Sequence, residues 1–313
     1  MAAAALATAS LSSCIYDDQS ECPSVKISYT YNMKYADAAP HEVDNVKLYA
    51  YDSDHNLVYT KEVGSEELKN REYTLNMAGF PESAAEIITW GFGTERNADS
   101  YTFGDSQKET NLTCLINSNS GAVTSDLTPL FYAKNPASVV REHGVIDLMK
   151  DTNVVRIILQ NQTGEPLSPD DFVFEITAAN CSMNYDNSLA DSQTLTYSPW
   201  NVYTGSAGMN SNDASDATIS VVAAEFTVGR LVDGQRNVVT VYRKSTGDKV
   251  FSIPLNDFAL LVKGSYNSSM SNQEYLDRQD EWNMTFFLTS GGKWIASSII
   301  INSWRVVLSN VDL

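Results

Sequence analysis

The run Leu11-Ser12-Ser13-Cys14 carries the clearest chemistry in the chain. A leucine, two small residues and a cysteine are typical of the place where a bacterial signal peptide is removed and the cysteine is acylated. We therefore predict a covalent lipid on Cys14 and no other cofactor. Each buried methylene of an acyl chain contributes about 0.8 kcal/mol, so dual acylation is enough to hold a protein on a membrane. Residues 1–13 are then a residual signal peptide and residues 14–23 a lipidated linker.

Two short motifs resemble metal sites but lack essential ligands. Asp52-Ser53-Asp54-His55-Asn56 begins like a calcium loop, yet Leu57 replaces the glycine of the sharp turn and Val63 replaces the bidentate glutamate. His41-Glu42 begins like a zinc-protease motif, but Asn45 stands where the second histidine is needed. We predict solvated turns at both places and no metal site.

The residues that nucleophilic and acid-base catalysis need are few. Gly205-Ser206-Ala207-Gly208 lacks the spacing of a nucleophile elbow and falls in a loop predicted at 204–216. The pairs Asp170-Asp171 and Asp277 with Asp280 could serve a glycosidase, but turn and helix surfaces explain them better. The chain has only three histidines, all in polar contexts: His41, His55 and His143. We predict no catalytic residues, no enzymatic activity and no small-molecule substrate.

The five tryptophans support an alternative function. They are Trp90, Trp200, Trp282, Trp294 and Trp304. Trp90, Trp294 and Trp304 lie in or beside predicted strands, where core packing is the common role. Trp200 follows Tyr197-Ser198-Pro199 in a loop and is free to stack on a sugar ring. A glycan-binding surface lipoprotein is therefore the alternative.

The charge of the chain excludes one class of partner. Its 39 acidic and 21 basic residues are spread along the sequence and give a net charge of −18. Such a surface repels nucleic acid and anionic membrane surfaces, so we predict no nucleic-acid partner. No window beyond the N-terminus approaches the roughly 18 uninterrupted apolar residues of a membrane helix. Membrane attachment would therefore rest on the lipid.

Cysteines contribute little to the fold. The four cysteines are too few for a disulfide scaffold, so the fold must rest on hydrophobic cores. If Cys14 is acylated, at most one bridge can form within the chain. We name Cys22 with Cys114 as a possible disulfide because both fall in the first half. A free buried thiol is the equal alternative for each.

The hydrophobic pattern predicts an all-β fold. Short runs in which β-favouring and polar residues alternate are typical of half-buried strands. A length of 313 residues favours two domains, and a polar break before Val154 places the boundary near 148. We predict two tandem antiparallel β-sandwich domains, 24–148 and 149–313. The strands expected in the first are Val25–Tyr31, Val46–Tyr51, Leu57–Thr60, Glu72–Met77 and Glu86–Phe92.

The second domain repeats this style with one departure. Asn256–Val262 and Asn272–Asp280 lack alternation and carry capping residues before apolar positions at helical spacing, which predicts one or two short helices. A long strand-like run from Trp294 to Leu308 ends the pattern. The other expected strands are Val154–Leu159, Phe172–Ala178, Ala217–Val228, Asn237–Arg243, Lys249–Ile253 and Met284–Leu288.

Several segments carry a family resemblance: Cys14–Asp18 with Cys22-Pro23, Tyr31–Ala38, Glu274–Thr285 and Asn302–Leu308. They resemble the fimbrillin-associated anchor lipoproteins, the minor subunits at the base of type V fimbriae. The resemblance implies transthyretin-like (Greek-key) topology in both sandwiches and lipid attachment at the cell outer membrane, exposed on the surface. It also implies assembly with fimbrial shaft subunits by strand exchange.

The resemblance also implies where base and shaft subunits differ. In related shaft subunits, a trypsin-like protease cuts after an arginine near the N-terminus and removes the first strand with the lipid. This chain has no arginine before Arg71, which favours retention of both; Lys26 and Lys34 stay open as sites for a protease of different specificity. Such a base subunit would donate a strand to the shaft. We predict the donor strand in the C-terminal run, with the apolar residues Val306, Val307, Leu308 and Val311.

Overall fold

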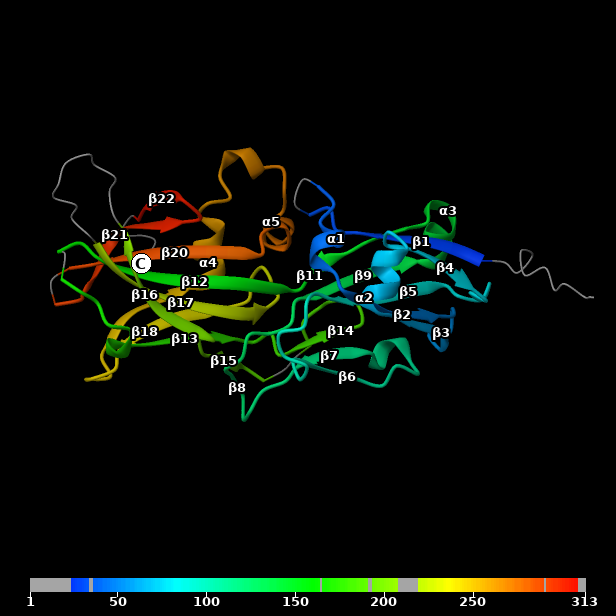
Figure 1. Ribbon diagram of the computed structural model, residues 1–313, viewed down its shortest axis with the longest axis horizontal. Helices are drawn as coiled ribbons and strands as arrows, with labels where there is room; N and C mark the ends of the chain where they lie inside the picture. The colour runs from blue at the N-terminus through cyan, green and yellow to red at the C-terminus, as the bar shows by residue number, and fades with distance from the viewer. Residues whose placement is uncertain are drawn as a thin grey trace, which may run out of the picture.

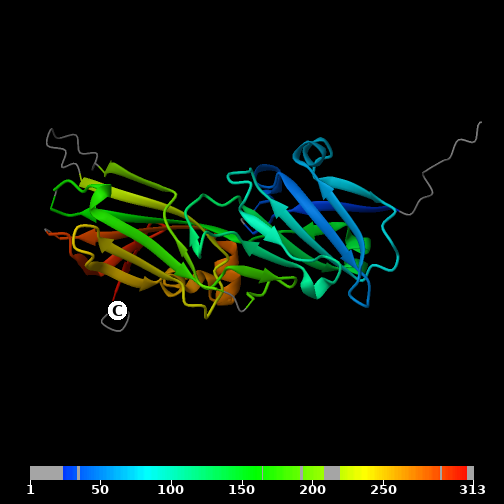
Figure 2. The ribbon, with the colours of Figure 1, turned by 90° about the horizontal axis from the view of Figure 1, so that it is seen from below.

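Most of the alternating runs are strands in the computed structural model, and the all-β prediction is confirmed. The structure describes residues 24–33, 36–163, 165–190, 193–207, 219–289 and 291–308. These residues form an elongated molecule with one lobe at each end of the long axis (Figures 1 and 2). β5 and β13 have the bounds that the sequence predicts, Glu86–Phe92 and Phe172–Ala178.

The lobe formed by the first half of the chain contains a three-stranded sheet and a five-stranded sheet, besides strands β6 (Tyr101–Phe103) and β7 (Thr113–Ile116) described below. The three-stranded sheet has the order β10 (Val145–Asp147), β1 (Ser24–Thr30), β4 (Thr74–Ala78). The five-stranded sheet has the order β11 (Met149–Lys150), β9 (Leu130–Pro136), β5, β2 (Asn45–Tyr51), β3 (Leu57–Val63). Alternate residues of β2 enter different cores: Leu48 packs with the residues under β1, whereas Tyr49 packs on the opposite face. The central strands of this sheet are therefore buried on both sides.

The predicted first strand is an interior strand of its own sheet. β1 pairs in parallel with β10 and antiparallel with β4, from Ser24 opposite Ala78 to Thr30 opposite Asp147. Its side chains Ile27 and Tyr29 are buried. Removing β1 would expose this core and leave two strands unpaired.

Two larger sheets face each other in the other lobe. The six-stranded sheet has the order β16 (Asn201–Ala207), β17 (Ile219–Gly229), β12 (Thr152–Asn161), β20 (Glu281–Leu288), β21 (Trp294–Ile301), β22 (Trp304–Val307). The opposing sheet has the order β19 (Lys249–Pro254), β18 (Val238–Arg243), β13, β15 (Leu195–Tyr197), β8 (Ala122–Val123). β16 occupies the start of the loop predicted at 204–216, so that part of the loop prediction is wrong.

The two halves of the chain share sheets. β8 comes from the first half and pairs in parallel with β15. β14 (Ser182–Asn184) comes from the second half and pairs with β7 (Thr113–Ile116), beside β6 (Tyr101–Phe103). Parallel pairs β1–β10, β8–β15 and β12–β20 also depart from the purely antiparallel expectation. A division into domains at residue 148 therefore stays a prediction.

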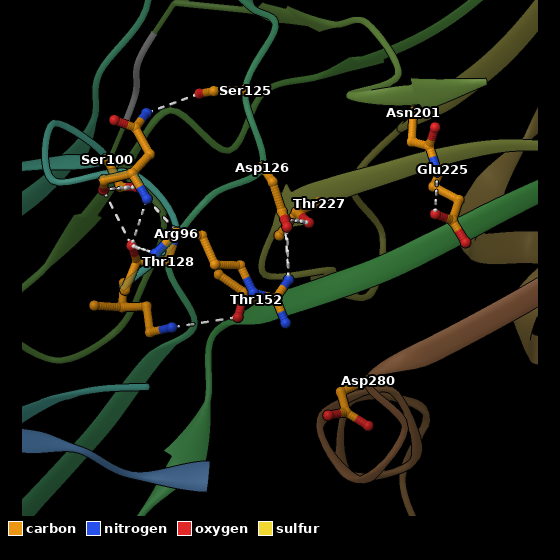
Figure 3. Close-up of polar contacts among 12 residues, drawn as sticks. Arg96, Ser100, Ser125, Asp126, Thr128, Thr152, Asn201, Glu225, Thr227 and Asp280 are labelled. Atoms are coloured by element: carbon orange, nitrogen blue, oxygen red, sulfur yellow. Dashed lines mark hydrogen bonds and ion pairs between the residues drawn. The ribbon is translucent and has the colours of Figure 1, made fainter. Parts of the chain in front are cut away.

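Polar contacts join the two lobes where loops of the first half reach the six-stranded sheet (Figure 3). Arg96 Nη1 donates to Asp126 Oδ1 at 3.0 Å. The same oxygen accepts from Thr227 Oγ1 of β17 at 2.5 Å. The backbone N–H of Leu130 donates to Thr152 Oγ1 of β12 at 3.3 Å. The bonds to Asp126 and from Leu130 hold this part of the first half against β17 and β12 of the second lobe.

In the described ranges, five short helices connect the strands: α1 (Ala39–Glu42), α2 (Ser65–Asn70), α3 (Ala137–His143), α4 (Leu255–Leu260) and α5 (Asn272–Arg278). α4 and α5 confirm the predicted helices. Ser271 caps α5 because its Oγ accepts from the N–H of Glu274 at 3.0 Å. Helices α1 to α3 were not predicted, since runs this short carry little periodicity. The described 3₁₀ turns are Glu109–Asn111, Pro169–Asp171 and Ser265–Asn267.

Candidate functional site

The C-terminal run predicted as one long strand is a hairpin instead. Asn302 and Ser303 have φ values of 46° and 73°, as a two-residue type I′ turn requires, and they reverse the chain between β21 and β22. β22 pairs with β21 alone among the described strands and so forms an edge of the six-stranded sheet. Figure 1 shows this hairpin far from Ser24, where the described chain begins.

The residues predicted as the donor strand lie at this edge. Val306 and Val307 belong to β22, and Leu308 follows directly. Val307 is 75% exposed, Val306 is half-buried and Leu308 is buried. Val311 lies outside the described residues. The donor role itself stays a prediction.

A groove of about 620 Å³ lies beside β22. The segment that follows α4 and Tyr275 of α5 also line it. Tyr266 is fully exposed beside it, and Trp304 is 69% exposed. The residues that line it are Leu261, Val262, Lys263, Gly264, Ser265, Tyr266, Asn267, Tyr275, Gln279, Trp304, Arg305 and Val306.

The charge of this groove differs from that of the whole chain. Lys263 and Arg305 are the charged residues in its lining, and both are basic. Lys263 Nζ lies 3.0 Å from Asn272 Oδ1, a neutral partner, and Arg305 Nη2 lies 3.5 Å from Ser298 Oγ. The groove is therefore a positively charged, partly apolar surface on a chain whose net charge is −18.

The prediction of core packing is wrong for Trp304. The other tryptophans of the predicted strands are held as expected: Trp90 is fully buried, and Trp294 packs on Phe251 and Phe286. Trp304 instead starts an edge strand after a tight turn, where few elements cover a side chain. Trp200 is 37% exposed, as its loop position predicts.

The carboxylate pairs have structural partners. Lys150 Nζ of β11 lies 2.8 Å from both Glu42 Oε2 and Asp280 Oδ2, which ties α1 to the segment after α5. Asp277 accepts two bonds from the Arg230 guanidinium, at 2.9 and 2.8 Å. Asp170 and Asp171 lie exposed in a 3₁₀ turn. Among these described carboxylates, Asp280 lines a hollow without Asp277, and Lys150 engages it.

Of the two motifs that resembled metal sites, Asp52–Asn56 is a turn as predicted, whereas His41-Glu42 ends helix α1, so the turn predicted there is wrong. Asp52 Oδ1 accepts from the backbone N–H groups of Asp54 and Asn56, both at 2.9 Å, and closes a tight turn. His55 forms a short contact with the buried Glu109 and is not aimed at a ligand site. His41 and His143 are exposed. No group of histidine, cysteine or acidic side chains in the described ranges could hold a metal ion.

The structure also locates two of the cysteines. Cys114 and Cys181 are free and buried, and burial raises the pKa of both thiols. The predicted bridge between Cys114 and Cys22 stays a prediction. Cys14 and Cys22 lie outside the described residues, so lipidation and the state of Cys22 stay predictions. Within the described ranges, no helix has both the length and the apolar content to cross a membrane.

Comparisons with known proteins extend the resemblance to nearly the whole chain. The family of fimbrillin-A associated anchor proteins Mfa1 and Mfa2 matches residues 19–310. The minor fimbrium anchoring subunit Mfa2 of Porphyromonas gingivalis is 23% identical over 262 residues, which cover 78% of this chain and 75% of that protein.

Two solved structures share the fold. A candidate adhesin from Bacteroides thetaiotaomicron has a TM-score of 0.80 and 30% identity, covering 92% of this chain and 99% of that one. The fimbrial anchor protein Mfa2 of Porphyromonas gingivalis has a TM-score of 0.64 and 17% identity, covering 91% and 99%. The family match over most of the chain carries the conclusion: this protein belongs to the family of fimbrillin-A associated anchor proteins.

Proposed function

We propose that this protein is an outer-membrane lipoprotein that anchors a fimbria to the cell surface and joins its shaft by strand exchange. Membership of the anchor family associates the chain with fimbriae and with the cell surface. The lipid on Cys14 and the exchanged strand are the further steps of the proposal. The observation that carries them is the contrast between the two ends of the molecule: an interior first strand and a weakly held last strand.

The first end suits permanent attachment. β1 has a hydrogen-bonded neighbour on each side and buries Ile27 and Tyr29. Proteolytic removal of β1 would break its hydrogen bonds to both β10 and β4 and so destabilise the fold. The strand and anything covalently upstream of it should therefore stay with the folded chain. A lipid on Cys14 would then hold this end at the membrane.

The last strand suits donation. β22 has one partner, β21, with four register pairs between Ser298 opposite Val307 and Ile301 opposite Trp304. Trp304 and Val307 are already mostly exposed, so detaching β22 would expose little additional apolar surface to water. The main buried side chain that it would expose is Leu308. In a shaft subunit with an open sheet edge, the same residues would gain two-sided pairing. We therefore retain the C-terminal segment 306–313 as the donor.

Two changes test the proposal in cells that assemble the fimbria. Cys14→Ala should release fimbriae into the medium, whereas the control Cys22→Ala should leave them attached. Deleting 306–313 should leave the protein in the membrane without fimbriae. Mass spectrometry of the native protein should find acyl groups and a start at Cys14. Attached fimbriae after the deletion refute donation, and a start beyond β1 or a missing acyl group refutes the anchor.

Glycan binding remains a second candidate because Trp200, just before the edge strand β16, and Tyr203 within it are 37% and 39% exposed. Affinity electrophoresis with a panel of polysaccharides tests it. Retardation that disappears in Trp200→Ala would support this function, and migration unchanged by every polysaccharide would exclude it for that panel.

A further inference from the structure

The groove beside β22 has the composition of a peptide-binding site rather than of an ordinary surface hollow. It has exposed aromatic side chains in Tyr266 and Trp304, aliphatic ones in Leu261 and Val306, and an adjacent strand edge. Backbone groups on the outer side of β22 have no partner strand among the described residues. An extended segment placed there could pair with β22 and set alternate side chains into the groove.

The charge of the groove lining favours an acidic segment over a basic one. Lys263 and Arg305 contribute two positive charges to the lining, which has no acidic residue, on a chain with a net charge of −18. Carboxylates are present in the adjoining hollow toward β1, in Asp280 and Glu281, and Asp280 is engaged by Lys150. An acidic segment is therefore attracted at the β22 end, and a basic one is repelled there.

We propose that this groove binds an acidic, extended segment of a partner protein, which adds a strand to β22 with its aliphatic side chains against Trp304 and Leu261. This site is distinct from the donor role proposed above, because binding needs β22 in its own sheet and donation removes it. A bound segment would pair with β22 on its second side and so oppose its release. The effect on strand release rests on the proposed function, whereas the binding site itself does not.

The test uses the purified full chain and three synthetic peptides: alternating Glu and Val, alternating Lys and Val, and alternating Glu and Gly. Isothermal titration calorimetry should detect saturable binding of the Glu–Val peptide alone, since the other two lack the charge or the aliphatic side chains. The double variant Lys263→Glu with Arg305→Glu should weaken that binding at least about fivefold, because both cations of the lining become anions that repel the carboxylates of the peptide.

Two further variants separate the groove from general charge. Lys249→Glu with Lys293→Glu makes the same change in net charge at a different basic hollow, and should leave the affinity unchanged. Tyr266→Ala removes a fully exposed side chain, which cannot unfold the chain, and should weaken binding. The proposal is overturned if the Glu–Val peptide fails to bind at millimolar concentration, if the Lys–Val peptide binds as tightly, or if both double variants weaken binding equally. Concentration-dependent dimerisation through β22, or polysaccharide binding abolished by Tyr266→Ala without peptide binding, would also overturn it.

Failure of this proposal and failure of the anchor proposal give different results. The groove variants change neither Cys14 nor residues 306–313, so fimbriae should stay attached. Loss of attached fimbriae in Tyr266→Ala would show instead that the groove belongs to shaft attachment.

Discussion

Replacing Asp151 by asparagine should stabilise the protein, and only above acidic pH. Asp151 lies between β11 and β12, where the chain passes from one lobe to the other, and it is fully buried. Its Oδ1 accepts from Asn187 Nδ2 at 2.9 Å, but its Oδ2 has no hydrogen-bond partner. Arg230 lies 3.9 Å away and makes its short bonds to Asp277 instead. The ionised carboxylate is therefore poorly compensated.

The magnitude follows from the pKa. Burial raises the pKa of Asp151 from 3.8 to about 7, although the nearby Arg230 opposes the rise. One pKa unit corresponds to ~1.4 kcal/mol, so ionised Asp151 destabilises the folded chain by up to roughly 4 kcal/mol above pH 7. This cost is absent below pH 3.8, grows between the unfolded and folded pKa values, and is complete above the folded value. The neutral amide avoids it and offers a donor beside Asn187 Oδ1, which is also buried without a partner.

Urea unfolding of both chains from pH 4 to pH 9 measures the difference. We expect the free energy of unfolding of Asp151→Asn to match the parent near pH 4 and to exceed it by about 2–4 kcal/mol at pH 8. Asp186→Asn is the control: hydrogen bonds from Ser188 lower the pKa of this exposed carboxyl, so its change should be small and destabilising at pH 8. A gain that is the same at every pH, or a loss at pH 8, would refute the reasoning.

Two other variants test the packing by urea unfolding at pH 7. Lys150→Met should cost about 3–5 kcal/mol because it removes the ammonium group that lies 2.8 Å from Glu42 Oε2 and from the buried Asp280 Oδ2, whereas Lys47→Met, at an exposed pair, should cost under ~1 kcal/mol. Equal effects would show that the Lys150 contacts are not structural. Trp282→Ala should cost about 3–5 kcal/mol and Trp304→Ala clearly less, because the first side chain is fully buried and the second 69% exposed. A similar loss for both would show that Trp304 is buried in solution.

The local sequence pattern was sufficient to predict many of the strands but not all of them. Runs that alternate, such as Phe172–Ala178, end where β13 ends, since alternation reports one buried face. β9 was not predicted because Leu130 to Ala133 are all buried between two cores, and a run buried on both faces shows no alternation of apolar and polar residues. The turn at Asn302 could have been inferred from the tendency of asparagine to adopt positive φ, and it decides that β22 is separate from β21.

The sequence by itself determined the all-β class, the acidic surface, the acylation motif at Cys14 and the family resemblance, because composition and short motifs are local properties of the chain. Only the tertiary structure decided that Trp304 is exposed, that Asp151 is buried, and that Lys263 meets Arg305 across a groove. Burial and proximity depend on which distant segments pack together, and here residues 261–267 and 304–306, far apart in the sequence, line one groove.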